Sequence, residues 1–546
     1  MTTAGSSFGD GLVGTVATPH AVHAKLAKGP GKVGMAVFAV ALAVGLVYAA
    51  THLAADLARV NTTSALPFVL LGVALAVALG FEFVNGFHDT ANAVATVIYT
   101  HSLDPHIAVV WSGMWNFVGV LFSTGAVAFG IVSLLPVELI LQVGSGAGFA
   151  MVFALLTAAI IWNVGTWYMG LPASSSHTLI GSIIGVGLAN QIVSTGVPTS
   201  GVDWQQAANI GWSLLLSPLV GFVCAALLLV TLKKVLPNRR LYAAPEGTQP
   251  PPFWIRGLLL LTCTGVSFAH GSNDGQKGMG LIMLILIGTV PTAYALNHAV
   301  SPRQSLDFVA VSAQAAETLR HYTNDVPSPG NPRAEVQEYV RSRTLTPTTL
   351  PALQAMIGDV GRDMARFKEL KNVPPSQTRN FRNDLYLIGE DLRLLEKSQT
   401  PTISAADRAV LKNYRRHTDA ATKFIPGWVK VAVALALGLG TMLGWKRIVV
   451  TVGERIGKDH LAYAQGACAE LTAMATIGAA DAFGLPVSTT HVLSSGVAGT
   501  MAANHSGLQI ATVRNLLMTW VLTLPASILL AGSLFWLFSR IGLKVG

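Results

Sequence analysis

Two polar stretches with an aspartate each lie inside long apolar segments of the chain. Residues 80–97 carry Asp89, and residues 270–278 carry Asp274. A carboxylate at membrane depth costs about 2.5–3.5 kcal/mol on insertion scales, so such a residue usually has a functional role. Gly86-Phe-His-Asp89 aligns with Gly271-Ser-Asn-Asp274. Two copies of a Gly-rich, Asp-bearing interruption predict the binding site of a duplicated membrane transporter.

A second matched pair places a proline before hydroxyl side chains and a histidine. The two copies read Pro172-Ala-Ser-Ser-Ser-His177 and Pro486-Val-Ser-Thr-Thr-His491. Such a pattern signals a helix start, where hydroxyls cap and the first amides lack internal partners. Helix N-termini attract anions, so two that face each other would surround a tetrahedral oxyanion with donors. One copy alone is equally compatible with a Pro-kinked helix whose hydroxyls bond back to the backbone.

The charged groups of the first pair suggest what such a site could hold. When ionised, Asp89 and Asp274 only accept hydrogen bonds. They therefore suit a coordinated cation, or a proton shared with a doubly ionisable anion. Lys277 adds a cation within reach of either carboxylate or substrate.

Other titratable residues in these segments are candidates for proton handling. Histidine carries protons near neutral pH, although a single histidine is more often structural. Glu82 and Glu470 suit proton handling and helix packing equally well. The proton-coupling candidates are Glu82, His88, His177, His270, Glu470 and His491.

Composition and charge distribution indicate a polytopic membrane protein. Of 546 residues 51% are apolar and 12% charged, and the mean hydropathy is +0.53. The net charge of +9 does not indicate nucleic-acid binding, because no Lys or Arg occurs between Arg59 and Lys233 or between Lys458 and Arg514. Basic residues gather in short loops, as the positive-inside rule expects. The three cysteines lie in apolar segments, so neither a disulfide framework nor a CxxC metal site is expected.

Composition shifts along the chain divide it into segments. The stretch 107–135 is expected to cross the membrane once, and 297–425 holds 18 Lys/Arg and 14 Asp/Glu. We expect a polar N-terminal tail (1–33), an extra N-terminal transmembrane helix (34–56), a first transport repeat (66–232), a basic Pro-rich cytoplasmic linker (233–253), the start of a second repeat (254–296), an inserted hydrophilic helical subdomain (297–425) and the remainder of the second repeat (426–540).

The spacing of the two motif pairs supports duplication. Asp89 and His177 are 88 residues apart, and Asp274 and His491 are 217 apart. Removing the 129 residues of 297–425 leaves 88 in the second copy as well. A register this close indicates two repeats and one insertion.

The short basic loops predict the orientation. Loops 233–256 and 446–458 should be cytoplasmic, which gives each half an odd number of crossings and makes the halves inverted. The insert then lies outside the cytoplasm. The expected fold is an all-α polytopic membrane protein of two inverted repeats with broken helices or hairpins, about 10–12 transmembrane segments and an inserted soluble helical subdomain.

Four stretches together resemble the inorganic phosphate transporter (Pit) family, and most of all its bacterial low-affinity, proton-coupled branch. They are Asn85-Gly-Phe-His-Asp-Thr-Ala-Asn-Ala-Val-Ala-Thr-Val-Ile98, Pro172-Ala-Ser-Ser-Ser-His-Thr-Leu-Ile-Gly181, His270-Gly-Ser-Asn-Asp-Gly-Gln-Lys-Gly278 and Pro486-Val-Ser-Thr-Thr-His-Val-Leu-Ser-Ser495. Sodium-coupled members carry Gly-Ala-Asn-Asp-Val-Ala-Asn-Ala in both halves. Here His88 replaces the first Asn, and Gln276-Lys277 replaces the later Ala-Asn, which argues against sodium coupling.

The resemblance implies proton-coupled symport of inorganic phosphate, largely as a divalent metal-phosphate complex, across the bacterial inner membrane. It implies a non-enzymatic protein without a cofactor whose partners are phosphate, protons, divalent metal ions and lipid, with no nucleic acid; a homo-oligomer stays open. Through the substrate, Asp89 and Asp274 would hold the metal. The expected substrate-binding residues are Asp89, Asn92, Ser174, Ser175, Ser176, Thr178, Asn273, Asp274, Gln276, Lys277, Ser488, Thr489 and Thr490.

Four other functions compete with this interpretation. They are a sulfate permease of the same superfamily, sodium-coupled phosphate symport, an intramembrane hydrolase that uses Ser176 or Thr490 with a histidine, and a helical anchor for 297–425. The anchor leaves the four polar motifs in lipid unexplained, and duplicated hydroxyl clusters suit symmetric binding better than one nucleophile.

Overall fold

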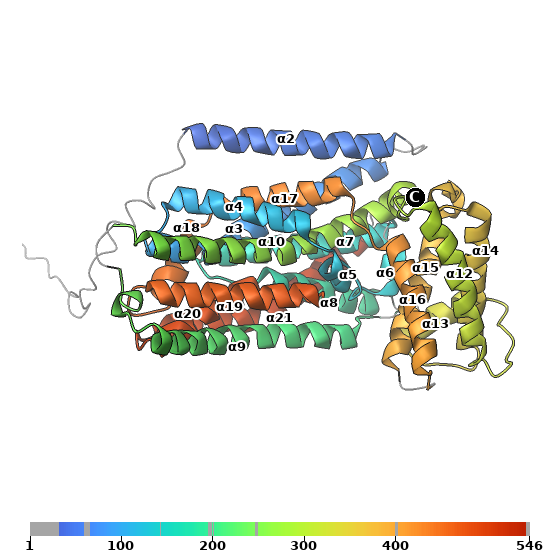
Figure 1. Ribbon diagram of the computed structural model, residues 1–546. Coiled ribbons are helices and arrows are strands. Elements are labelled where there is room, and N and C mark those ends of the chain that lie inside the picture. Colours follow the sequence, from blue (N-terminus) through green and yellow to red (C-terminus); the bar gives the residue numbers. More distant parts are fainter. Residues whose placement is uncertain are drawn as a thin grey trace, which may run out of the picture.

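The computed structural model describes residues 32–58, 66–141, 144–194, 199, 201–245, 249–398 and 402–541, and it describes residues 90–92 only as part of a helix. Within these ranges the structure is helical, and its β structure is one isolated bridge between Gly457 and Leu508. Long helices lie side by side in an elongated bundle, and five helices form a second bundle at one end (Figure 1). The predicted all-helical fold is confirmed.

The elongated bundle contains most helices of both halves. In chain order they are α2 (Lys32–Leu57), α3 (Leu66–Tyr99), α4 (Pro105–Phe122), α5 (Ala126–Val132), α6 (Val137–Leu141), α7 (Gly146–Tyr168), α8 (Ser175–Val193), α9 (Trp204–Val235), α10 (Phe253–Thr289), α11 (Pro291–Tyr294), α17 (Gly427–Thr441), α18 (Lys446–Val450), α19 (Tyr463–Ala482), α20 (Thr489–Ala503) and α21 (Ile510–Ile541).

The chain is a multi-span membrane protein. Among the described helices eight are long and apolar enough to cross a membrane, or nine if the bent pair Ala405–Thr422 and Gly427–Thr441 is one span. This number is below the 10–12 segments expected from the sequence. The difference comes from α17 and α20, which have 15 residues each, and from α19, whose sequence is not apolar enough. Many residues of these three helices are buried against other helices.

The two Asp motifs lie in continuous helices. α3 and α10 run for 34 and 37 residues through Asp89 and Asp274, so the polar motifs interrupt the apolar sequence but do not break the helices. Their glycines allow close helix packing instead. A Cβ on Gly86 would lie 2.2 Å from Leu437 O, and one on Gly271 would lie 2.1 Å from Asn116 O. Only glycine lets the neighbouring backbones approach this closely.

The two halves interlock through these contacts. α3 packs against α17 of the second half, and α10 packs against α4 of the first half. The start of α10 meets the end of α3, where Arg256 Nε donates to Ser102 O at 2.8 Å. α3 and α10 therefore run antiparallel.

The chain does break before α8 and α20. Gly170 and Gly484 adopt φ values of +69° and +66°, and each is followed by Leu-Pro. Ser174 Oγ and Ser488 Oγ then cap the new helices by accepting from the amide three residues later. The helix starts predicted from the Pro-hydroxyl pattern are confirmed.

The stretch 107–135, predicted as one crossing, forms two helices instead. α4 ends at Phe122, and α5 begins after Gly125, whose φ is +88°. A left-handed residue at this point does not fit a continuous right-handed helix. Val127 N in the first turn of α5 donates to Gln276 Oε1 at 3.0 Å, which ties α5 to α10.

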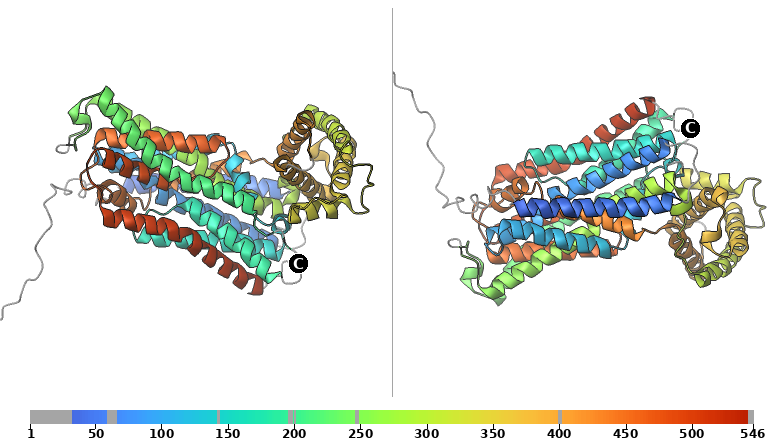
Figure 2. Two further views of the ribbon diagram at one scale, coloured as in Figure 1. Left: turned by 90° about the horizontal axis from the view of Figure 1, so that it is seen from below. Right: turned by 90° about the horizontal axis from the view of Figure 1, so that it is seen from above.

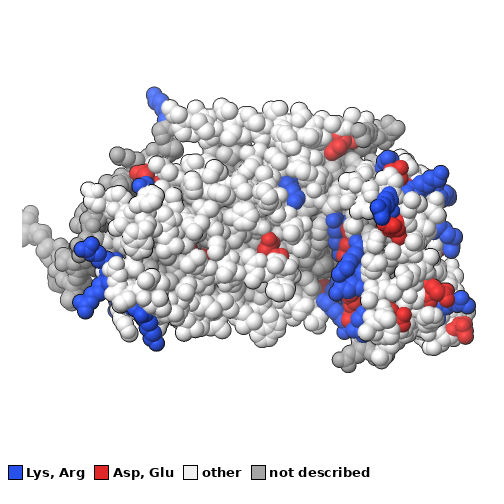
Figure 3. Space-filling view, in the orientation of Figure 1, with Lys and Arg blue, Asp and Glu red and all other residues white. Residues whose placement is uncertain are grey.

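Residues between α11 and α17 form a separate helical bundle with its own apolar core. Charged residues gather over this end and at the opposite end of the molecule, while the surface between them in Figure 3 is nearly uncharged. Figure 2 shows the bundle projecting beyond the long helices. Its helices are α12 (Pro302–Arg320), α13 (Pro332–Ser342), α14 (Thr349–Phe367), α15 (Pro375–Lys397) and α16 (Ala405–Thr422).

One carboxylate fastens this bundle to the first half of the chain. Asp203, just before α9, forms ion pairs of 3.0 Å with both Arg343 and Arg393. Burial raises the pKa of Asp203, but the hydrogen bond from Gln206 N and the two guanidinium groups outweigh this effect and hold the pKa below its ordinary value. The carboxylate therefore stays charged at neutral pH.

α2 lies on the outside of the long bundle, where it packs against α17 (Figure 2). Most of its apolar side chains are exposed, and Gly45 is buried against Leu435. In a membrane this surface would face lipid. Residues 1–31 of the predicted polar tail lie outside the described residues.

Candidate functional site

Asp89 is buried in the last third of α3 and contacts α8 and α20, the second helices of two helical hairpins, α7–α8 and α19–α20. Ser175 Oγ donates to Asp89 Oδ2 at 2.8 Å, and Thr490 Oγ1 donates to Asp89 Oδ1. His88 Nδ1 lies 3.3 Å from the same Oδ1 atom. Because Ser175 begins α8 and Thr490 lies in the first turn of α20, this carboxylate joins the two halves.

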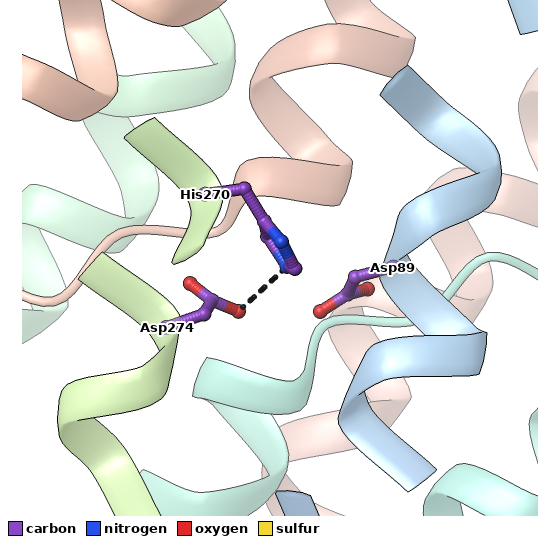
Figure 4. Close-up of side chains that lie close together, drawn as sticks. All are labelled: Asp89, His270 and Asp274. Atoms are coloured by element: carbon purple, nitrogen blue, oxygen red, sulfur yellow. Dashed lines mark ion pairs between the residues drawn. The ribbon is translucent and has the colours of Figure 1, made fainter. Parts of the chain in front are cut away.

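Asp274 has a cationic neighbour on its own helix. Lys277 Nζ lies 2.7 Å from Asp274 Oδ2, and His270 Nε2 lies 3.4 Å from the same oxygen. Asp274 Oδ1 has no hydrogen-bond partner among the described residues. Figure 4 shows the ring of His270 reaching between the carboxylates of Asp274 and Asp89.

Ser175 connects the two carboxylates. Its Oγ lies 3.2 Å from Lys277 Nζ and 3.4 Å from Asp274 Oδ2, in addition to the 2.8 Å bond to Asp89. A serine has one proton to donate, and the shorter bond gives it to Asp89; the oxygen then accepts from Lys277. The result is a continuous polar chain from Asp274 through Lys277 and Ser175 to Asp89.

Three of these side chains could hold a cation together. One ligand atom each of Asp89, His270 and Asp274 lies within 4.8 Å of the others. His270 Nδ1 lies 3.0 Å from Asn116 Oδ1, while Asn116 Nδ2 donates to Thr441 Oγ1. Asn116 thereby places the ring proton on Nδ1, which leaves Nε2 to carry a second proton or a metal.

The two hairpin helices meet beside Asp89. Ser176 Oγ in α8 donates to Val487 O, just before α20, at 2.6 Å. The rings of His177 and His491 lie 4.6 Å apart, and His491 stacks on Trp520 at 4.0 Å. Two helix N-termini, with their free amides and positive dipole ends, thus point at one small region.

Asn273 and Gln276, predicted to bind substrate, contact neighbouring structural elements. Asn273 Nδ2 donates to Leu485 O at 3.1 Å, which holds the second hairpin. Gln276 Nε2 donates to Asp481 Oδ1 at 2.6 Å, while its Oε1 accepts from α5. Both side chains position the elements around the cluster.

The predicted hydroxyls divide into several groups. Ser174 and Ser488 are helix caps, and Thr178 Oγ1 donates to Asn163 Oδ1 at 3.0 Å. Thr489 Oγ1 is buried and has no hydrogen-bond partner among the described residues. The side chain of Asn92 lies outside the described part of the structure.

Of the remaining candidates for proton handling, His88 and Glu82 lie next to the cluster and Glu470 lies apart from it. His88 Nε2 lies 3.2 Å from Thr166 Oγ1. Glu82 is fully buried against Gly278, the residue after Lys277, and neither of its oxygens has a hydrogen bond of good geometry to a described residue. Glu470 lies elsewhere on α19, where Thr262 Oγ1 donates to it.

Several supporting residues were not predicted from the sequence. Asn116 orients His270, Thr166 contacts His88, and Asp481 accepts from Ser272 Oγ at 2.7 Å as well as from Gln276. Asp481 had a visible signal, because it is an acid near the end of an apolar segment. Asn116 and Thr166 had none, since single amides and hydroxyls are common in membrane helices.

Comparison with known proteins now identifies the family. The model of the phosphate transporter family matches residues 85–531, which include both Asp motifs and both hairpins. The chain belongs to this family of membrane transporters. The relatives described next are named as transporters and not as enzymes.

The chain is similar to two transporters of Escherichia coli strain K12. It is 42% identical over 486 residues to the low-affinity inorganic phosphate transporter PitA, and 41% identical over 487 residues to PitB. Each match covers 86% of this chain and 96% of the relative. A solved structure described as the sodium-dependent phosphate transporter is similar with 18% identity and a TM-score of 0.47, covering 87% of this chain and all of that one.

Proposed function

We propose that this protein is a secondary active transporter that imports inorganic phosphate together with protons across a bacterial cytoplasmic membrane. The observation that carries the proposal is the buried cluster of Asp89, Ser175, Asp274 and Lys277 beside two helix N-termini. A carboxylate pair with an ammonium and free amide donors suits an anion that brings its own proton or metal. Family membership supports phosphate as that anion.

Phosphate would replace contacts that the side chains make with one another. Lys277 has three N–H donors and contacts both Asp274 and Ser175. Thr489 Oγ1 offers a further buried donor at the start of α20. We propose that the phosphate oxygens accept hydrogen bonds from these groups and from the first amides of α8 and α20.

A divalent cation would enter as part of the substrate. Carboxylate oxygens together with phosphate oxygens are the usual ligands of Mg²⁺. Asp89, Asp274 and His270 provide three convergent ligand atoms. The metal-phosphate complex would place its cation between these side chains and its phosphate toward Lys277.

Lys277 also favours protons over sodium as the coupling ion. Its ammonium lies 2.7 Å from Asp274, where a coordinated sodium ion would compete with it. Proton transfer then falls to the buried groups nearby. Among them, Glu82 lies against the Lys277 turn of α10, and His88 and His270 each contact one of the two aspartates.

The halves would act as inverted repeats in alternating access. The antiparallel α3 and α10, the matched close contacts of Gly86 and Gly271, and the two alike hairpins support this arrangement. The basic loops lie at the end opposite the insert, visible as blue in Figure 3, which supports a cytoplasmic location for that end. The insert would then face outside.

Uptake into proteoliposomes tests the proposal. A pH gradient, acid outside, should drive phosphate accumulation without sodium, and arsenate should compete better than sulfate. Uptake that requires sodium and ignores the pH gradient would contradict proton coupling. Preference for sulfate would favour a sulfate permease instead.

The two hydroxyls proposed as nucleophiles of an intramembrane hydrolase have other hydrogen-bond partners. Ser176 Oγ donates to a backbone carbonyl, and Thr490 Oγ1 donates to Asp89 rather than to a histidine. We therefore expect no phosphate release from a chromogenic phosphate ester under conditions that support uptake.

A further inference from the structure

A small cavity lies where the insert meets the transport helices, apart from the cluster around Asp89. It has a volume of about 40 Å³ and is lined by α5, α10, α15 and the end of α16. A water molecule needs about 10–15 Å³ measured in this way, so the cavity holds about three waters or a similarly small ion.

Arg382 is a buried cation of this cavity whose guanidinium lies over the ring of Tyr386, 5.0 Å from the ring centroid, and which forms no ion pair with a described carboxylate. Its side chain is only 6% exposed, its Nη1 donates to the neutral Asn383 at 3.2 Å, and its Nε has no hydrogen-bond partner among the described residues. Burial lowers the pKa of Arg382, but a guanidinium stays protonated in proteins. A buried cation without an opposite charge is unfavourable until an anion joins it.

The two other charged lining residues already have partners. Glu390 pairs with Arg393, and Lys423 pairs with Asp419, each at 2.7 Å. Among the described residues no carboxylate lies within ion-pair distance of Arg382. The planar guanidinium is also the side chain best suited to two parallel hydrogen bonds with a phosphate group.

The cavity lies on α10 directly beyond the central cluster. Gly280, Leu284 and Ile287 line it at helical spacing, one to three turns after Lys277. At 1.5 Å per residue, Leu284 lies about 10 Å along the helix from Lys277. The neighbouring wall is α5, which Gln276 ties to α10 through Val127 N.

We propose that this cavity is an outer anion site, where Arg382 of the insert binds phosphate before it moves along α10 to Lys277. The inference rests on the proposed transport of phosphate and adds a residue of the insert to substrate capture. An anion in the cavity neutralises the charge of Arg382. From there it moves toward Lys277, the nearest cation of the central cluster.

Uptake kinetics of reconstituted full-length variants test the site. R382Q should raise the KM for phosphate about tenfold, because a hydrogen bond to a charged group is lost, and should leave the maximal rate within about twofold. R382K keeps a cation in the cavity and should restore most of the affinity. The matched control is R366Q, since Arg366 is 61% exposed on α14 of the same bundle.

Three outcomes separate the possibilities. A wild-type KM in R382Q would overturn the outer site while phosphate transport itself stands. If both R382Q and R382K lose maximal rate and thermal stability, Arg382 has a structural role. This result would also overturn the outer site. Wild-type protein that takes up no phosphate would instead contradict the proposed function.

Discussion

The two halves of the molecule use the same backbone arrangement for different chemistry. Asp89 and Asp274 occupy the same place in matched helices, each three residues after a glycine that meets the opposite half. Asp89 is held by hydroxyls from both hairpins, whereas Asp274 is paired with Lys277 on its own helix. The two motif helices are thus alike in their close glycine contacts and differ in the side chains that surround each aspartate.

The different surroundings of Asp89 and Asp274 can be traced to single positions in the sequence. The residue that corresponds to Lys277 in the first half is Asn92, at the same distance after the aspartate. The first half therefore lacks a built-in cation at this position of the motif. Asp89 accepts hydrogen bonds from α8 and α20, and Asp274 is paired with a cation of its own helix.

Removing either carboxylate charge should have the largest effect. Asp89→Asn keeps the shape but weakens the bonds from two hydroxyls, and Asp274→Asn leaves Lys277 buried without its counter-charge. Removing one partner of a buried pair costs about 3–5 kcal/mol, so uptake should fall to about 1% or less. Phosphate uptake and membrane insertion are measured together. If one variant transports at nearly the wild-type rate, the two-carboxylate site is wrong.

Making the second half like the first should have the next largest effect. Lys277→Asn removes the ammonium that occupies Asp274, so an external cation is needed to balance the two aspartates. We expect phosphate uptake to fall at least about tenfold without sodium and to recover in part when sodium is added. The exposed Lys234→Asn is the control. Sodium-independent uptake in K277N would contradict the role given to Lys277.

Thr490 and Ser176 occupy matching places in the two hairpins, and their substitution tests whether the hairpins differ in function. Thr490 donates to the Asp89 carboxylate, while its counterpart Ser176 donates to the carbonyl of Val487. Hydrogen bonds to charged groups contribute about 1.5–3 kcal/mol and neutral ones about 1 kcal/mol. Thr490→Val should therefore lower phosphate affinity about 10- to 100-fold, and Ser176→Ala at most about fivefold. Equal losses would mean that the two hairpins act alike.

The halves also differ in length, and this difference should matter least for the transport step. α3 and α4 are joined by residues 100–104, whereas 297–425 separates the corresponding elements α10 and α17. Replacing the insert by a linker of about 2–8 Gly/Ser residues should preserve the maximal rate but raise the KM as R382Q does. Proteoliposome uptake measures both values. A folded deletion variant that binds no phosphate would show that the insert shapes the central site.

Residue types and spacing were enough to predict the elements of the cluster, but not the direction of every side chain. Asp89, Ser175, Asp274 and Lys277 stood out as polar groups in apolar segments, and the structure brings them together. Gln276 looked equivalent to its neighbour, yet it faces Asp481. Which face of α10 meets α5 or α19 depends on tertiary packing that one sequence does not specify.

The same limit applies to the glycines of the motifs. Glycine promotes both turns and close helix contacts, and only the partner helix decides between them. Gly86 and Gly271 meet a backbone carbonyl and stay helical, whereas Gly170 and Gly484 precede Leu-Pro and adopt positive φ. In this chain the following proline was the informative signal.

The ion pairs of Asp203 with Arg343 and Arg393 have a practical consequence for imaging. Small membrane proteins align poorly in electron cryo-microscopy when a detergent micelle hides all of their features. Here a folded helical bundle projects from one end and is tied by charge to the loop before α9. An antibody fragment raised against α13 or α14 would give particles a visible, firmly connected marker without touching the transport helices.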